Sequence, residues 1–375
     1  MSLPSAIVPS RLDDLLVRAR REVDEGRLPG FQLAVGFERD IVYAEAYGEA
    51  RDDQRFHTYS AIKPTVSLTA MELAAEGLFD LDDPVASILP TFGTNGKEAI
   101  TVSQVLQHKG GFPAAPMSLL VAVDRDARLE LYGTWRTTWE PGTRFEYHPS
   151  AAHWVLGDLI QEITGRPYAD VVTERVMAPA GQPRWLAIPE HEQADIADVF
   201  CVGEPISPVE FKEQFGIELP VTEVTDEALT SFNDSTVRAL GVPGGGGITN
   251  ASGFASWYQA ILHDDGEILR PEVKHDALTI VRQTHKDHLG VSANRTHAFI
   301  LAGDDGRANG RGHGHTVSPM TFGHGGARGQ LAWADPASGV SLGFMTNGLE
   351  RHLLQDARRS IAISTKAGLL TTPVG

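Results

Sequence analysis

The chain has 375 residues, of which 42% are hydrophobic and 22% charged, so it can bury a sizeable core and is neither disordered nor fibrous. Its 49 acidic and 32 basic residues give a net charge of −17, which disfavours nucleic acid and anionic membranes as partners. Cys201 is the single cysteine, so no intramolecular disulfide can form and no oxidising compartment is needed.

The N-terminal residues 1–11 lack the basic start and the long apolar core of a signal peptide. No apolar run reaches the roughly 18 residues that a membrane-spanning helix needs. We therefore expect a cytoplasmic protein with no membrane partner.

The first 50 residues predict a helix and a β-hairpin. Ser10 is placed to cap a helix that ends near Gly26, and its apolar residues recur at helical spacing. In residues 31–37, large apolar side chains alternate with smaller or polar ones. A turn at 38–40 then leads into a second strand at 41–47.

Residues 65–76 predict a second helix, which stops at Gly77. Its apolar residues are expected largely on one side. Helical patterns and long loops dominate from about residue 78 to 242, and the clearest helix is Ala152–Thr164 with Gly165 as its C-cap.

Strand patterns return near the C-terminus at residues 330–334 and 340–346, and a helix with Leu353, Leu354, Ala357 and Ile361 on its apolar face closes the chain. Strands at both ends with helices between them predict an α+β fold. We expect an antiparallel sheet flanked by helices, built from both chain ends and interrupted by a helical insertion. The predicted domain spans residues 12–365, with an α/β core from 12–78 and 241–365 and a mainly helical region over 79–240.

Ser60 and Lys63 lie three residues apart at the start of a predicted helix, so the amine can reach the hydroxyl. A serine hydroxyl becomes an effective nucleophile when a nearby base takes its proton. The helix N-terminus also supplies free N–H groups for a developing oxyanion. By itself, however, the S-x-x-K pattern is common on solvated helix faces.

An ordered series of further motifs makes the pattern specific. The series resembles the serine β-lactamase and penicillin-binding protein superfamily, and most closely the class C-like (family VIII type) esterases. The matching segments are residues 59–64, 76–85, 100–111, 141–147 and 322–327.

The resemblance implies a β-lactamase/DD-peptidase-like fold with Ser60 as nucleophile. It makes Tyr147 a general base beside Lys63, and it leaves open whether a neutral Lys63 or a Tyr147 phenolate takes the serine proton. From the residues alone, a core tyrosine with its hydroxyl hydrogen-bonded is the favoured interpretation of Tyr147.

The resemblance also assigns the substrate-binding residues. It implies an oxyanion hole made by the backbone N–H groups of Ser60 and Ala327. His324, Gly325 and Gly326 would then orient or admit the substrate. No cofactor and no metal are implied, and the partner is a small-molecule ester. The sequence does not determine the oligomeric state.

Two motifs depart from the family pattern, at three positions. Pro149 stands where a polar residue normally follows the tyrosine, and the third motif begins with His324 instead of lysine and continues with Gly325 instead of threonine. A histidine is mostly uncharged at neutral pH, so a substrate carboxylate loses its point charge.

We therefore expect a carboxylesterase for small or short-chain esters that acts through an acyl-enzyme. The alternatives are a β-lactamase or D-amino-acid peptidase, an acyltransferase, and, in a different class, a non-catalytic scaffold.

Other candidate residues have simpler interpretations. Ser341 matches the G-x-S-x-G nucleophile pattern, but it follows a turn and alternates as a strand residue. His313 and His315 could form a metal site with His324, but no carboxylates accompany them at fixed spacing. We expect the glycine-rich segment 303–314 to be a mobile loop near the active-site mouth, and Cys201 to be a packing residue.

Overall fold

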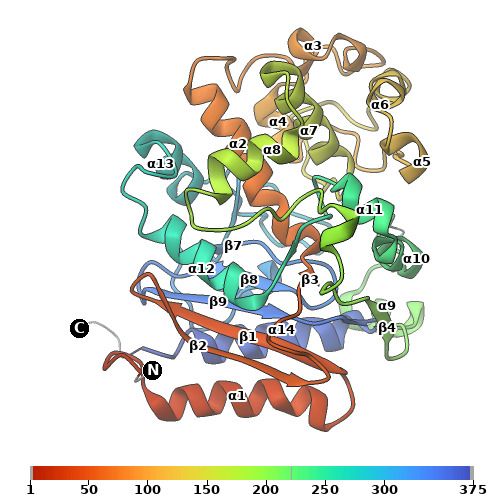
Figure 1. The fold of residues 1–375 in the computed structure, drawn as a ribbon. Helices are drawn as coiled ribbons and strands as arrows, with labels where there is room; N and C mark the ends of the chain where they lie inside the picture. The colour runs from red at the N-terminus through yellow and green to blue at the C-terminus, as the bar shows by residue number, and fades with distance from the viewer. Residues whose placement is uncertain (1–2, 221, 372–375) are drawn as a thin grey trace.

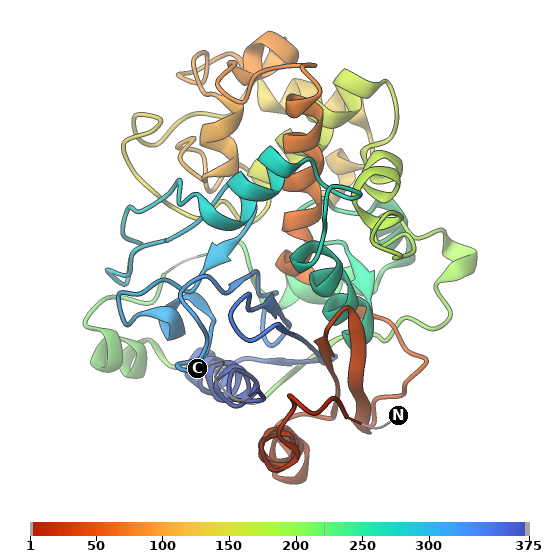
Figure 2. The same ribbon diagram turned by 90° about the vertical axis from the view of Figure 1, so that its left-hand side faces the viewer.

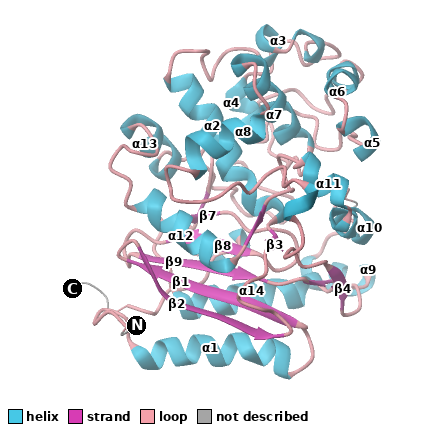
Figure 3. Ribbon diagram, in the orientation of Figure 1, coloured by secondary structure: helices cyan, strands magenta, loops and turns pink. Residues whose placement is uncertain are grey.

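The computed structural model describes residues 3–220 and 222–371, which form a sheet layer and a helical layer (Figures 1 and 3). The sheet of the described residues has six antiparallel strands in the order β2-β1-β9-β8-β7-β6. Its strands come from both chain ends, as predicted. They are β1 (Gly30–Phe37), β2 (Asp40–Gly48), β6 (Ile300–Leu301), β7 (Phe322–Gly323), β8 (Leu331–Ala334) and β9 (Val340–Met345).

Helices cover both faces of this sheet. Helices α1 (Pro9–Asp24) and α14 (Leu353–Ala367) lie side by side below it, and Figure 2 shows them nearly end-on. Large side chains of β1 such as Phe31 and Leu33 fill the core on that face. Helix α12 (Ala251–Leu262) packs on the other face, where a side chain at Gly343 would meet the Ala251 carbonyl 2.2 Å away. Small residues thus allow α12 to approach the sheet closely.

The helical layer surrounds α2 (Lys63–Ala75), which follows a 3₁₀ turn, η1 (Tyr59–Ile62). Residues 63–73 of α2 are all buried, because other helices enclose the helix. The remaining helices are α3 (Val85–Ile88), α4 (Val102–Leu106), α5 (Leu119–Ala122), α6 (Arg125–Tyr132), α7 (Ala151–Thr164), α8 (Tyr168–Val172), α9 (Pro208–Phe215), α10 (Asp226–Thr230), α11 (Ser235–Leu240) and α13 (Pro271–Thr279).

Two small sheets join the layers. Strands β3 (Phe56–His57) and β5 (Ile248–Thr249) pair antiparallel just before the nucleophile turn. Strands β4 (Phe200–Val202) and β10 (Gly348–Glu350) pair parallel at the edge of the molecule. No described helix is both long and apolar enough to cross a membrane.

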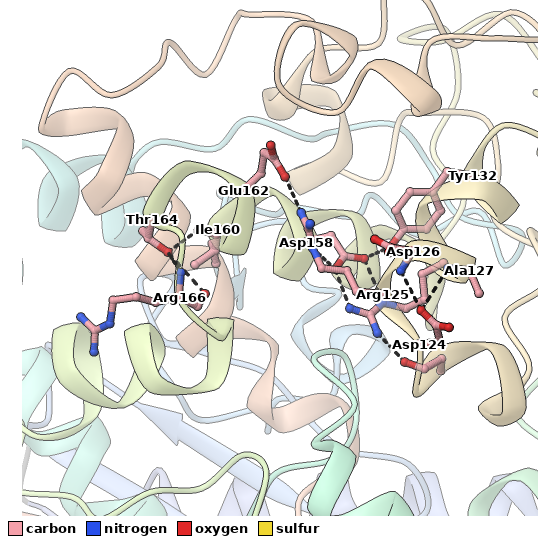
Figure 4. Close-up of polar contacts among 12 residues, drawn as sticks. Asp124, Arg125, Asp126, Ala127, Tyr132, Asp158, Ile160, Glu162, Thr164 and Arg166 are labelled. Atoms are coloured by element: carbon pink, nitrogen blue, oxygen red, sulfur yellow. Dashed lines mark hydrogen bonds and ion pairs between the residues drawn. The ribbon is translucent and has the colours of Figure 1, made fainter.

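A buried polar network fastens α6 to α7 (Figure 4). The Asp158 carboxylate accepts hydrogen bonds from Arg128 Nε and Nη2 at 3.0 and 2.7 Å, and from the Tyr132 hydroxyl at 2.6 Å. Arg125 joins the network from the rim, where it also pairs with Glu162. Because α6 and α7 flank residues 133–150, the network holds both ends of the segment that carries Tyr147 and Pro149.

Several sequence predictions of local structure need correction. Helix α1 begins at Pro9 with Val8 as its N-cap, so Ser10 lies inside the first turn, because proline suits the first helical position. Helix α2 has no single apolar side, since it is buried all round. In α14, Ile363 and Ala367 face the core whereas Leu353 and Ala357 are exposed. The hairpin, the C-terminal strands and α7 with its left-handed Gly165 are confirmed.

Candidate active site

A strained turn presents Ser60 to a pocket of the described structure. Thr58 N–H donates to the Gly247 carbonyl at 2.9 Å beside the β3–β5 pair. Tyr59 has a positive φ of 46°, a conformation that costs free energy for a bulky side chain. It is held there because its hydroxyl donates to the Leu229 carbonyl at 3.1 Å. The chain thus turns sharply into α2 directly at the nucleophile.

Lys63 contacts Ser60 directly. Its Nζ lies 3.1 Å from Ser60 Oγ, 2.7 Å from the Pro149 carbonyl oxygen, and within hydrogen-bond distance of the Gly244 carbonyl oxygen. The side chain is 1% exposed and forms no ion pair with a described carboxylate. Burial lowers the pKa of Lys63, and nearby Tyr147 opposes this shift.

This geometry suits a neutral amine. A neutral lysine keeps two hydrogens and one lone pair. The two hydrogens donate to the carbonyls of Pro149 and Gly244, and the lone pair is left to accept the Ser60 proton. A protonated Lys63 would donate to all three oxygens and could not act as a base. The second-motif proline therefore contributes a backbone acceptor, although its side chain offers none.

Tyr147 lies beside Lys63 but is not hydrogen-bonded to it. Lys63 Nζ is 5.3 Å from the centre of the Tyr147 ring. The Tyr147 hydroxyl is buried and has no hydrogen-bond partner among the described residues. A buried hydroxyl without a partner is costly, so Tyr147 has an unmet hydrogen bond that the described residues do not supply. The structure thus brings Lys63 into contact with Ser60, and Tyr147 lies beside Lys63.

Neutral histidines surround Tyr147. The rings of His108 and His324 lie 4.7 and 6.1 Å from its ring, and His153 lies 6.0 Å from His108. Burial lowers the pKa of each of these three histidines well below its usual value. They add imidazole groups to the site without adding charge at neutral pH.

The third motif approaches the nucleophile through its glycines. A side chain at Gly326 would lie 2.1 Å from the Thr58 carbonyl oxygen, so only glycine fits there. The next residue, Ala327, lines the pocket together with Ser60. Within the described part of the chain, neither the Ser60 N–H nor the Ala327 N–H has a backbone acceptor. Both N–H groups thus remain candidates for the predicted oxyanion hole.

The pocket has a volume of about 460 Å³ and is largely apolar. Among its lining side chains, the only carboxylates are Glu223 and Glu227. Burial raises the pKa of Glu223, and the attraction of Lys63 opposes this shift. Apolar and aromatic lining residues include Tyr59, Met117, Leu119, Trp154, Val242 and Phe232.

The other predicted site residues lie away from the pocket. His324 is 6% exposed and lies behind Tyr147, and neither it nor Gly325 or Gly326 lines the pocket. The segment 303–314 does not form the pocket mouth as expected. It contains the turn η6 (Ala308–Arg311), and Gly314 packs against α14.

The two alternative nucleophiles and the histidine pair also lie elsewhere. Ser341 is fully buried in β9 and donates to the Ala255 carbonyl at 2.7 Å. Cys201 lies half-buried in β4. His313 is buried against the Ile300 carbonyl, whereas His315 is exposed. The described residues contain no cluster of three or more His, Cys, Asp or Glu side chains placed to hold a metal ion.

Sequence reasoning missed three parts of the site: the carbonyls of Pro149 and Gly244, and the side chain of Arg295. A side chain at Gly244 would lie 3.2 Å from Lys63 Nζ, so glycine is needed for close approach. The run of four glycines at 244–247 was a usable signal for it. Arg295 places its guanidinium 5.0 Å from the Tyr147 ring centre, and nothing in the local sequence indicates this.

Comparisons with known proteins agree with the fold and show the family. The family model described as Beta-lactamase matches residues 15–366. The esterase EstB of Burkholderia gladioli is 27% identical, with 92% of each chain covered. A penicillin-binding protein homologue from Caulobacter crescentus superimposes with a TM-score of 0.77 at 21% identity, covering 98% of each chain. A family VIII carboxylesterase superimposes with a TM-score of 0.76 at 23% identity, covering 98% of this chain and all of the other (100%).

Proposed function

The chain belongs to the beta-lactamase family, and from this we propose that it is a serine hydrolase that cleaves small or short-chain carboxylic esters through an acyl-enzyme on Ser60. The observation that carries the proposal is the contact of 3.1 Å between Lys63 Nζ and Ser60 Oγ, with Lys63 buried and in no ion pair with a described carboxylate. Esterase activity in the EstB relative supports the substrate class.

In the proposed acylation step, neutral Lys63 takes the Ser60 proton while Ser60 Oγ attacks the ester carbonyl carbon. The N–H groups of Ser60 and Ala327 would stabilise the oxyanion. Lys63 or Tyr147 then returns the proton to the leaving alkoxide, which departs as the alcohol and leaves the acyl group on Ser60. Water attacks the acyl-enzyme through the same groups in reverse order and releases the carboxylic acid.

The charge of the pocket favours uncharged esters over β-lactams as substrates. A β-lactam antibiotic carries a carboxylate, and Glu223 and Glu227 would repel it from the pocket. A volume of about 460 Å³ suits a small acyl or alcohol group. We also propose a cytoplasmic location, because the single Cys201 leaves no need for an oxidising compartment.

The test combines labelling with turnover. The purified protein should hydrolyse p-nitrophenyl acetate and butyrate well above a chromogenic cephalosporin, and a fluorophosphonate should modify Ser60 as read by peptide mass spectrometry. Ser60→Ala should abolish ester turnover and fluorophosphonate labelling. Ser341→Ala, which removes the serine of the G-x-S-x-G pattern, is the matched control and should retain most of both. Labelling on Ser341, or cephalosporin turnover equal to the best ester, would overturn the proposal.

A further inference from the structure

Arg295 is a cation with no anionic partner that lies against Tyr147. Its guanidinium carbon is 5.0 Å from the centre of the Tyr147 ring and 5.7 Å from that of Phe145. Among the described residues no carboxylate lies within 4 Å of it, and its one side-chain hydrogen bond is with His324. Hydrogen bonds between the backbones of Arg295 and Gln283, each of 3.0 Å, fix the segment that carries it. The guanidinium is therefore held in place from outside the pocket.

His324 is arranged to receive this guanidinium. Its Nδ1 lies 2.8 Å from the Gly325 carbonyl oxygen, an acceptor only, so Nδ1 carries the proton. Nε2 then presents a lone pair, and Arg295 Nη1 lies 3.4 Å from it. Burial lowers the pKa of His324 well below its usual value, which keeps this ring neutral and able to accept. The histidine of the third motif thus contacts an arginine and not the pocket.

We propose that Arg295 is a positioning residue for the reaction, supplying the fixed positive charge that stabilises negative charge on the Tyr147 oxygen as a proton passes between Ser60, Lys63 and the leaving group. The inference rests on the proposed function, in which Tyr147 shares the proton path. Arg295 is partly exposed, and arginine stays protonated in either setting, so the charge is permanent. A cation placed without an anion fits a site where the anion appears only during the reaction.

The groups around Tyr147 leave Arg295 as the one permanent cation beside it in the described structure. Lys63 must be neutral to accept the Ser60 proton, so it provides no charge at that moment. His108 and His324, which face the ring, are neutral, as is His153 behind His108. The remaining charges act at longer range: Glu223 attracts Lys63, and Asp287 attracts Arg295.

The test uses the full-length enzyme and p-nitrophenyl butyrate, an uncharged ester. Arg295→Met should lower kcat about 10- to 100-fold with little change in KM, and should move the acid limb of the kcat/KM profile to higher pH. Arg295→Lys should keep most of the activity. His324→Lys in the Arg295→Met background should restore part of it, because it returns a cation to the same side of Tyr147. Arg282→Met is the matched control. Arg282 lies on the same segment as Arg295, between α13 and β6, but it is paired with Asp276.

Three results would overturn the inference. A loss in Arg295→Met that is uniform across pH, and that neither lysine variant relieves, would make Arg295 structural. A rise in KM limited to an anionic ester, such as a p-nitrophenyl hemisuccinate, would make it a substrate-carboxylate ligand. Full activity of Arg295→Met would leave it no role. If Arg295→Met does not fold by circular dichroism, Arg295→Gln replaces it. Failure of the wild-type chain to hydrolyse any ester would instead count against the proposed function.

Discussion

Replacing Asp158 with alanine tests whether the network between α6 and α7 holds the helical layer together. The substitution leaves the Arg128 guanidinium, whose side chain is 5% exposed, without its carboxylate. It also removes the acceptor of the buried Tyr132 hydroxyl. Breaking a buried ion pair costs about 3–5 kcal/mol, and an orphaned buried hydroxyl about 1–3 kcal/mol. Because both losses share one carboxylate, we expect the free energy of unfolding to fall by about 4 kcal/mol.

Urea unfolding followed by tryptophan fluorescence measures this change, since Trp154 lies on α7 with the Arg128 guanidinium 5.0 Å from its ring centre. Glu162→Ala is the matched control. It removes the partner of Arg125, in a pair whose side chains are 26% and 47% exposed, and should cost under about 1 kcal/mol. The loss in the free energy of unfolding for Asp158→Asn should lie between those of Asp158→Ala and Glu162→Ala. If Asp158→Ala unfolds within about 1 kcal/mol of Glu162→Ala, the network is not a fastening element and the reasoning fails.

Three further predictions concern the catalytic groups. Lys63→Ala and Tyr147→Phe should each reduce the acylation rate nearly as much as the double variant, because residues on one proton path are not additive; rates that simply multiply would remove Tyr147 from the path. Burial lowers the pKa of Lys63, and the neutral amine is the active form. The value of kcat/KM should therefore rise with pH, and the midpoint of this rise should lie below the usual lysine pKa of about 10.4. A profile that is flat from pH 5 to 10 would contradict this. Gly326→Ala should abolish turnover of p-nitrophenyl butyrate, because the added methyl group would lie 2.1 Å from the Thr58 carbonyl oxygen; wild-type activity in this variant would contradict the close approach.

Much of the fold was predictable because its signals are local. Alternation in residues 31–37 and 340–346 marks strands, and Gly165 marks the end of α7. The side that a helix buries is not a local property. Helix α2 is enclosed by segments far along the chain, so its own residues do not show which side is covered. For the same reason, the contact of segment 303–314 with α14 could not be predicted from its glycines.

The contacts of the candidate site are likewise of two kinds, those set by local sequence and those set by tertiary packing. Ser60 and Lys63 are three residues apart, so helical geometry alone brings them together, and their contact was predictable. The other partners of Lys63 are main-chain oxygens at Pro149 and Gly244, and a carbonyl oxygen is present at every residue. Arg295 reaches Tyr147 only because the segment between α13 and β6 folds back on itself and pairs with Ile300 of β6. Such contacts are set by tertiary packing and leave no pattern in the sequence.

The interleaving of the chain ends in the sheet has a consequence for how the protein matures on the ribosome. Strand β1 is made long before its neighbour on one side, β9 (residues 340–345), so the sheet cannot close until β9 has been made. The nucleophile turn likewise waits for β5, and the free N–H of Ala327 comes later still. Nascent chains that expose Ser60 and Lys63 therefore lack a working centre. Hydrolytic activity should therefore arise only after β9 has been made, about 15 to 60 seconds later than β1 at 5–20 residues per second.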